Sequence, residues 1–148
     1  MKSKFLVRID GNDSKVLSVS LQDILKVLDD GHQLHWSILW IYAIGHLENN
    51  KNMLDFENEV NTSNKGMFLT WEELNKLSDD FEQLLEIILI GVNDVKDLKR
   101  YESNESMYSI CKYTIELIDS SYWEIHSLNI TALQKMQDRL PGVKFIKE

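Results

Sequence analysis

The stretch LHWSILWIYAIGHL at residues 34–47 constrains the fold more strongly than any other part of the chain. Trp36 and Trp40 are four residues apart, a spacing that also fits one face of a helix. The aromatic and β-branched composition favours a strand, because such side chains pack well on a pleated surface. Alternate positions then place on one face Leu34, Trp36, Ile38, Trp40, Tyr42 and Ile44. The pattern predicts a long strand, buried on both faces over its later half, with both tryptophans in the core.

Length and composition favour one domain spanning residues 1–148. A chain of 148 residues with 43% hydrophobic residues is long enough to bury about 70% of the surface that its unfolded form exposes. The single Cys111 cannot form a disulfide within the chain, and the N-terminal sequence lacks the apolar segment of a signal peptide. The longest apolar run, at 38–44, is shorter than the roughly 18 residues of a membrane helix. We therefore expect a cytoplasmic domain without a membrane span.

Further strands are predicted along the chain. Residues 4–9 alternate apolar and charged side chains before the turn sequence DGND, so 15–20 is predicted to be their hairpin partner. Four more strands are predicted at 86–93, 108–118, 122–128 and 142–148. Hairpin connections of this kind indicate a mainly antiparallel sheet. The polar segment at 94–107 is aperiodic and is predicted to be an exposed loop.

About four helices are predicted to pack on this sheet, which gives an α+β fold. Two of them begin at capping-box spacings, Ser20 with Asp23 and Thr70 with Glu73. The second has the clearest helical periodicity in the chain, with apolar residues recurring through 71–84. The other two helices are predicted at 53–60 and around Leu133, Met136 and Leu140.

The formal net charge of −8 arises in the middle of the chain. Residues 1–47 hold five acidic and five basic side chains, and residues 106–148 also hold five of each. Residues 48–105 hold fourteen acidic and six basic side chains. Such a surface disfavours nucleic acid, whose phosphates are bound by Lys and Arg, and it suits a protein partner with a basic surface. Solubility alone is the other explanation for this charge.

The segment ELIDSSYWEIHS at 116–127 places Asp119, two serines and His126 within eight positions, and these are the residue types of a hydrolytic site. Asp and Ser are also ordinary turn residues, because their side chains hydrogen-bond to nearby backbone amides. In an extended return strand, His126 lies roughly 17 Å from the serines, too far to activate a hydroxyl. No GxSxG elbow flanks them. The segment therefore predicts a hairpin, and we expect no catalytic residues.

Metal and cofactor sites are not expected either. His32 and His35 form an HxxH pair, and ten residues separate His35 from His46, but a zinc site needs a further ligand at a firmer spacing. The adjacent carboxylates Glu72 and Glu73 diverge on a helix, so they do not converge on one substrate. No Gly-rich phosphate loop and no HExxH motif occur.

Four segments together resemble small bacterial proteins of the immunity type, which protect cells from secreted toxins. The segments are LHWSILWIYAIGHL, FENEV, KGMFLTWEELNKLSDDFEQ and IDSSYWEIHS, spanning roughly residues 30–128. The resemblance implies a small acidic cytoplasmic domain that binds and blocks a basic toxin domain, often a nuclease. It implies no chemistry of the chain's own, and no motif assigns toxin-contacting residues to positions in this sequence.

These observations lead to the hypothesis of an inhibitory binding protein that docks on a basic toxin domain. Between residues 54 and 86 there are nine acidic and two basic residues, so the two central helices hold most of the negative charge. Affinity would also need an aromatic anchor, for which two tyrosines near the 94–107 segment are candidates. The predicted partner-binding residues are Asp55, Glu57, Glu59, Glu72, Glu73, Asp79, Asp80, Tyr101 and Tyr108. The alternative is a small-molecule-binding domain with an aromatic pocket near Trp36 and Trp40.

Overall fold

A computed structural model describes residues 4–10, 19–45 and 52–146. Its seven strands form one sheet with the order β3-β2-β4-β5-β6-β1-β7. The strands are β1 (Phe5–Asp10), β2 (His35–Gly45), β3 (Met67–Leu69), β4 (Phe81–Val92), β5 (Tyr113–Ile118), β6 (Tyr122–Ser127) and β7 (Val143–Ile146). Every neighbouring pair is antiparallel, as the hairpin-rich sequence predicted.

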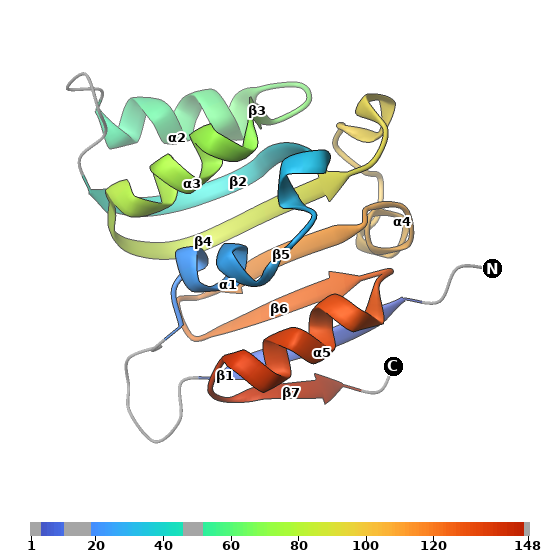
Figure 1. Ribbon diagram of the computed structural model, residues 1–148. Coiled ribbons are helices and arrows are strands. Elements are labelled where there is room, and N and C mark those ends of the chain that lie inside the picture. Colours follow the sequence, from blue (N-terminus) through green and yellow to red (C-terminus); the bar gives the residue numbers. More distant parts are fainter. Residues whose placement is uncertain (1–3, 11–18, 46–51, 147–148) are drawn as a thin grey trace.

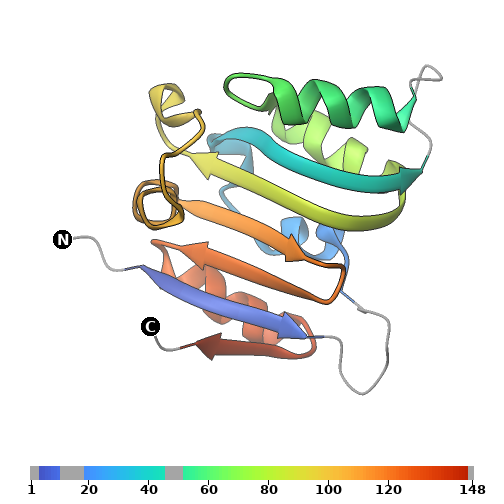
Figure 2. The same cartoon turned by 180° about the vertical axis from the view of Figure 1, so that it is seen from behind.

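Helices cover one face of this sheet and only part of the other. The α-helices in the described residues are α1 (Leu21–Val27), α2 (Met53–Thr62), α3 (Trp71–Asp80), α4 (Asn104–Ile110) and α5 (Ile130–Arg139). Helices α1, α3 and α5 lie over one face, and α2 runs beside β2 at the sheet edge (Figure 1). Helix α4 lies against one end of the opposite face, and none of the described helices covers the rest of that face, which we call the bare sheet face (Figure 2). The α+β prediction is confirmed, and none of the described helices could cross a membrane.

The helix starts follow the capping signals in the sequence. The Ser20 hydroxyl accepts a hydrogen bond from Asp23 N while the Asp23 carboxylate accepts one from Ser20 N, which fixes the start of α1. Thr70 and Glu73 form the same reciprocal pair at the start of α3. Each pair satisfies amide groups that have no partner within the helix, so both predicted starts are confirmed.

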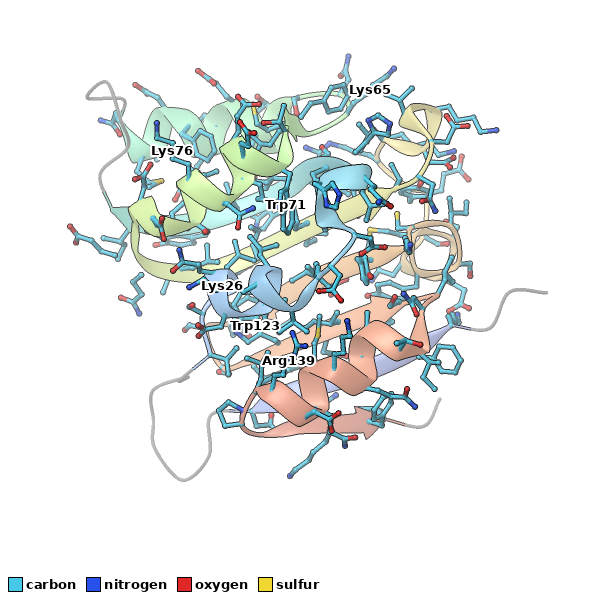
Figure 3. The ribbon with its side chains drawn as sticks, viewed as in Figure 1. Lys26, Lys65, Trp71, Lys76, Trp123 and Arg139 are labelled. Atoms are coloured by element: carbon cyan, nitrogen blue, oxygen red, sulfur yellow. The ribbon has the colours of Figure 1, made fainter. Side chains whose placement is uncertain are left out.

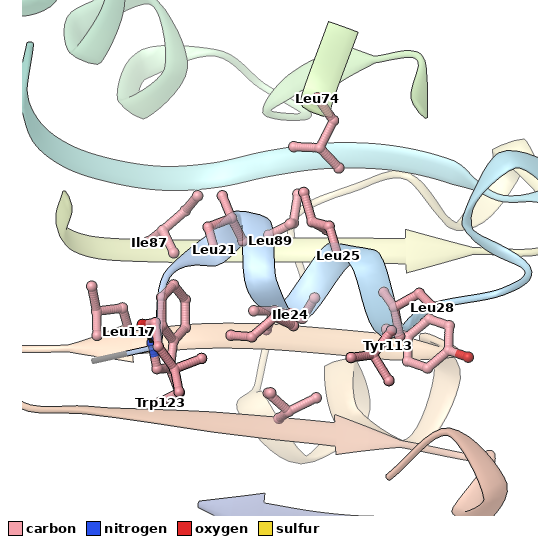
Figure 4. Close-up of a cluster of buried hydrophobic side chains, with 14 of the residues drawn as sticks. Leu21, Ile24, Leu25, Leu28, Leu74, Ile87, Leu89, Tyr113, Leu117 and Trp123 are labelled. Atoms are coloured by element: carbon pink, nitrogen blue, oxygen red, sulfur yellow. Dashed lines mark hydrogen bonds between the residues drawn. The ribbon is translucent and has the colours of Figure 1, made fainter. Parts of the chain in front are cut away.

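The main core lies between the sheet and the layer of α1, α3 and α5 (Figure 4). Trp36 and Trp123 are each 1% exposed, and their indole N–H groups donate to the backbone oxygens of Gly31 (2.8 Å) and Val19 (2.9 Å). These bonds satisfy the polar edge of each buried ring, which would otherwise be costly. A second, smaller core forms on the opposite face, beneath α4 and the 3₁₀ helix η3 (Val95–Asp97).

Strand β2 changes face at a bulge. Its pairing with β4 shifts register between Ile38 and Trp40, which inserts one extra residue into β2. Trp36 and Ile38 point into the main core before the bulge, and Ile41 and Ala43 point into it afterwards. Side chains alternate along a strand, so Trp40, which directly precedes Ile41, points to the opposite face.

The sequence prediction for the later half of β2 is therefore wrong. Trp40, Tyr42 and Ile44 are 42%, 51% and 49% exposed, and they point to the bare sheet face, opposite to Ile41 and Ala43 in the main core. The part buried on both faces is the earlier segment 36–39. We call Trp40, Tyr42 and Ile44 the β2 strip.

Four other boundaries differ from the sequence predictions. The strand predicted at 108–118 starts only at Tyr113, because residues 104–110 form α4. The helix predicted over 71–84 ends at Asp80, and β4 starts at the next residue, because Phe81 and Leu84 pair with β2 in the sheet. The predicted loop at 94–107 contains η3 and the start of α4. Strand β1 is paired by β6 on one side and β7 on the other, so it has no edge for the hairpin partner predicted at 15–20. Residues 15–18 of that partner lie outside the described residues.

The hairpin predicted at 116–127 is confirmed. Asp119 and Ser120 have φ angles of 49° and 52°, and Ser121 N donates to Ile118 O at 2.9 Å. Two consecutive positive φ values are typical of a type I′ turn, in which Asn-Gly is the favoured pair. Asp and especially Ser are strained in this conformation.

We expect the double substitution Asp119→Asn and Ser120→Gly to stabilise the domain by about 1 kcal/mol, because it relieves this strain. Urea unfolding monitored by circular dichroism measures the gain. Ser121→Gly is the matched control, since residue 121 does not share the positive φ. An equal gain from the control would contradict the assignment of the strain to 119 and 120.

Candidate protein-binding surfaces

Three of the seven predicted carboxylates have roles within the fold. Glu57 accepts a hydrogen bond from Ala43 N at 2.8 Å, and Glu73 accepts one from Thr70 N at 2.9 Å. The Asp79 carboxylate accepts a hydrogen bond from the Gln22 side chain. Glu73 and Asp79 nevertheless remain exposed, so their hydrogen bonds fix the two carboxylates in place without removing their charge from the surface.

The exposed carboxylates are divided between α2 and α3. Asp55 and Glu59 are exposed on α2. Glu72, Glu73 and Asp79 are exposed on α3, while Asp80 is half-buried at its end. Lys76 belongs to the same helix as Glu72, and Lys65 follows α2 (Figure 3). The negative field of this side is thus interrupted by two cations.

The two predicted anchor tyrosines are half-buried. Tyr101 belongs to the smaller core, and its hydroxyl donates to Asp97 O at 2.7 Å. Burial raises the pKa of Tyr101 above its usual range. Tyr108 stacks on His126 with ring centroids 3.5 Å apart, and its hydroxyl donates to Glu116 Oε1 at 2.8 Å. Both tyrosines help to attach the 94–110 segment to the sheet.

The β2 strip is an exposed apolar feature of the bare sheet face that the sequence did not predict. Tyr42 pairs with Glu86 of β4, and Trp40 pairs with Ile88. Both Glu86 and Ile88 are half-buried. Directly paired residues share a face and have Cβ atoms roughly 5 Å apart, so a carboxylate borders the strip.

The same row of the sheet continues into a pair of glutamates. Glu116 of β5 pairs with Ile88 on one side and with Glu124 of β6 on the other. Burial raises the pKa of Glu116, the hydrogen bond from Tyr108 lowers it, and the charge of Glu124 raises it. Glu124 in turn lies 3.8 Å from the Arg8 guanidinium. Like charges directly opposite each other destabilise a sheet, so this row favours an incoming cation.

Helix α2 closes the outer edge of β2 next to the strip. The Asn61 side chain accepts from Ile41 N at 3.0 Å and donates to Ile41 O at 3.1 Å, as a paired strand would. The Arg100 guanidinium donates to the backbone oxygens of Leu39, Val60 and Ser63 at 2.6–2.8 Å. These side chains occupy backbone groups that would otherwise invite strand addition. A partner at this end of the molecule must therefore contact the sheet face or the helices.

The aromatic pocket of the alternative hypothesis corresponds to a surface hollow of about 400 Å³ around Trp36. Its lining includes His32, His35, Phe68 and Trp71. Trp40 is absent from the lining, because the bulge turns it to the other face. The Trp71 ring, labelled in Figure 3, also packs close to Gly31. The hollow is wide enough for a small ligand, so this alternative remains open.

The hairpin serines and His126 are far apart along β6. Asp119, Ser120 and Ser121 form the turn that precedes this strand, whereas His126 lies near its other end and pairs with Thr114. Burial, and then the charge of Lys4, lower the pKa of His126 to about 4. Within the described residues no cluster of His, Cys, Asp and Glu could hold a metal ion, and His46 lies outside them.

Comparisons with known proteins assign no family to this chain. No family model, no curated protein and no solved structure matches it. The resemblance to immunity-type proteins therefore stays a prediction. The functional interpretation rests on the surfaces described above.

Proposed function

We propose that this chain is a cytoplasmic binding protein that captures and blocks a basic protein domain, in the manner of an immunity protein. The observation that carries the proposal is an exposed aromatic strip beside surplus carboxylates on the same molecule. Exposed apolar patches are typical of interaction sites, and negative potential speeds association with a basic partner. The bound partner's activity would be inhibited by steric occlusion, without chemistry from this chain.

The test uses the C-terminal domain of a secreted protein encoded beside this gene. Co-expression is expected to restore growth of cells that the domain kills, and the two purified proteins are expected to form a stable complex. A domain that kills equally well with and without this chain, or the lack of such a neighbouring gene, would contradict the proposal.

Charge reversal on α3 measures the electrostatic contribution. Glu72→Lys with Asp80→Lys is expected to weaken capture of that domain roughly tenfold at low salt, and less at high salt, where charges are screened. Glu102→Lys with Asp138→Lys is the matched control, because it changes the net charge equally on exposed residues outside α2 and α3. Isothermal titration calorimetry at two salt concentrations gives both affinities. Equal losses in the two variants would show that only net charge matters.

The small-molecule alternative is supported by the hollow around Trp36. Its aromatic lining suits a planar ligand, and its two histidines suit a polar substituent. Quenching of tryptophan fluorescence by a metabolite extract, lost in a Trp71→Leu variant, would favour this alternative over protein binding.

A further inference from the structure

We infer that the basic partner docks on the bare sheet face, where the β2 strip and Glu86 receive an arginine side chain of the partner. This inference rests on the proposed function and names its contact site. The predicted surface on α2 and α3 then acts as a neighbouring source of attraction, while the anchor lies on the sheet.

The β2 strip is apolar surface that the fold itself leaves unused. Trp40, Tyr42 and Ile44 are each between 42% and 51% exposed. The intervening residues Ile41 and Ala43 are each at most 4% exposed. The opposite end of the same face is covered by α4 and η3, which bury Leu39 and Ile90 in the smaller core. The covering therefore stops at the bulge, and three large side chains remain in contact with water.

The aromatic rings of the β2 strip and the carboxylates beside it favour a planar cation. Glu86 pairs with Tyr42, and Glu116 lies in the row of Trp40, two strands away across Ile88. A guanidinium stacks on aromatic rings and binds a carboxylate through two parallel hydrogen bonds, whereas an ammonium acts as a point charge. The strip and its carboxylates therefore match arginine better than lysine.

The remaining occupants fit this face less well. The carboxylates of Glu86, Glu116 and Glu124 repel the phosphates of nucleic acid and of anionic lipid headgroups. A second copy of this chain carries the same formal net charge of −8, so two copies repel each other, and Arg8 on its own β1 is already 3.8 Å from Glu124 and 4.9 Å from the Tyr122 ring. A foreign basic protein supplies arginine without displacing such contacts.

The first experiment is independent of the partner's identity. The full chain is titrated with hexa-arginine and with hexa-lysine peptides at low salt, and amide and indole NMR shifts are followed. We expect hexa-arginine to shift the Trp40 indole N–H and residues 40–44 and 86–88, and to bind at least fivefold more tightly than hexa-lysine. Shifts confined to α2 and α3, or equal affinity for the two peptides, would overturn the inference.

The second experiment uses the toxin domain of the neighbouring gene. Trp40→Ala with Tyr42→Ala is expected to weaken the complex at least 30-fold, while Phe145→Ala, an exposed aromatic on β7 at the far edge of the sheet, leaves it within threefold. A thermal unfolding scan confirms that each variant is folded.

The outcomes separate the two proposals. If the wild-type chain does not bind the domain, the proposed function fails. If the wild-type chain binds and the Trp40 and Tyr42 variant binds as tightly, only the docking site is wrong. If sedimentation shows a dimer that the same variant dissociates, a second copy covers the strip and the inference is overturned.

Discussion

Replacing Trp36 with alanine is expected to lower the free energy of unfolding by about 3–5 kcal/mol. The side chain is 1% exposed, and its ring stacks nearly parallel to Tyr113 at 6.3 Å and packs against Trp71 at 5.5 Å. Truncation would leave a cavity between these rings and would remove the donor to Gly31 O. Urea unfolding followed by far-UV circular dichroism measures the loss. A loss below about 1 kcal/mol would show that the rings repack.

Gly91 provides a specific check on that cavity, because it is the cross-strand partner of Trp36. A Cβ added at Gly91 would lie 2.7 Å from the Trp36 ring. We expect Gly91→Ala alone to cost about 2 kcal/mol through overpacking. In the Trp36→Ala background the added methyl enters the cavity, so the double variant should be more stable than the two separate losses predict, by at least about 1 kcal/mol. Additive losses would contradict direct packing of the ring on Gly91.

The sequence predicted which segments form strands and helices better than it predicted which side of each strand is buried. Strand β2 was correctly predicted because its aromatic and β-branched composition favours a strand. The bulge after Ile38 could not be predicted, since every position around it is apolar and either face could be the buried one. One inserted residue reverses the faces for the rest of the strand. The β2 strip was missed for this reason, and Trp40 was placed in the core.

Local periodicity also failed where tertiary pairing overrides it. Residues 71–84 keep a helical spacing of apolar residues throughout, yet the chain leaves the helix at Asp80, where pairing with β2 begins. The polar segment at 94–107 contains few apolar residues, but Leu98 and Met107 are sufficient to attach it to the sheet. Short helices supported by two or three contacts have little periodicity to detect.

The candidate site, too, could be predicted from the sequence only in part. The negative charge of residues 48–105 could be counted from the sequence. Which carboxylates also bond within the fold could not be predicted, because Glu57 reaches the backbone of β2 and Asp79 reaches Gln22 on another helix. Long-range hydrogen bonds of this kind depend on the packing of α2 and α3, which no local spacing specifies.

Between pH 7 and pH 4.5 the buried His126 is expected to cost the domain about 2–3 kcal/mol of stability. Burial, and then the charge of Lys4, lower its pKa in the folded state to about 4 from an ordinary value of 6.5. Between these two values the unfolded chain binds more protons than the folded chain. The contribution of the neutral imidazole is therefore complete above about pH 6.5 and is lost as the pH falls toward 4.

His126→Phe isolates this contribution, because a phenyl ring can keep the stacking on Tyr108 but cannot be protonated. Urea unfolding of both proteins at pH 7 and pH 4.5 gives the difference directly. Glu116 titrates in the opposite sense, since its raised pKa favours proton uptake by the folded chain, but it is present in both proteins. The wild-type chain should lose about 2–3 kcal/mol more than His126→Phe over this interval. Equal losses would mean that the folded chain admits a charged imidazole beneath α4, and α4 would then have to move away from the sheet as the pH falls.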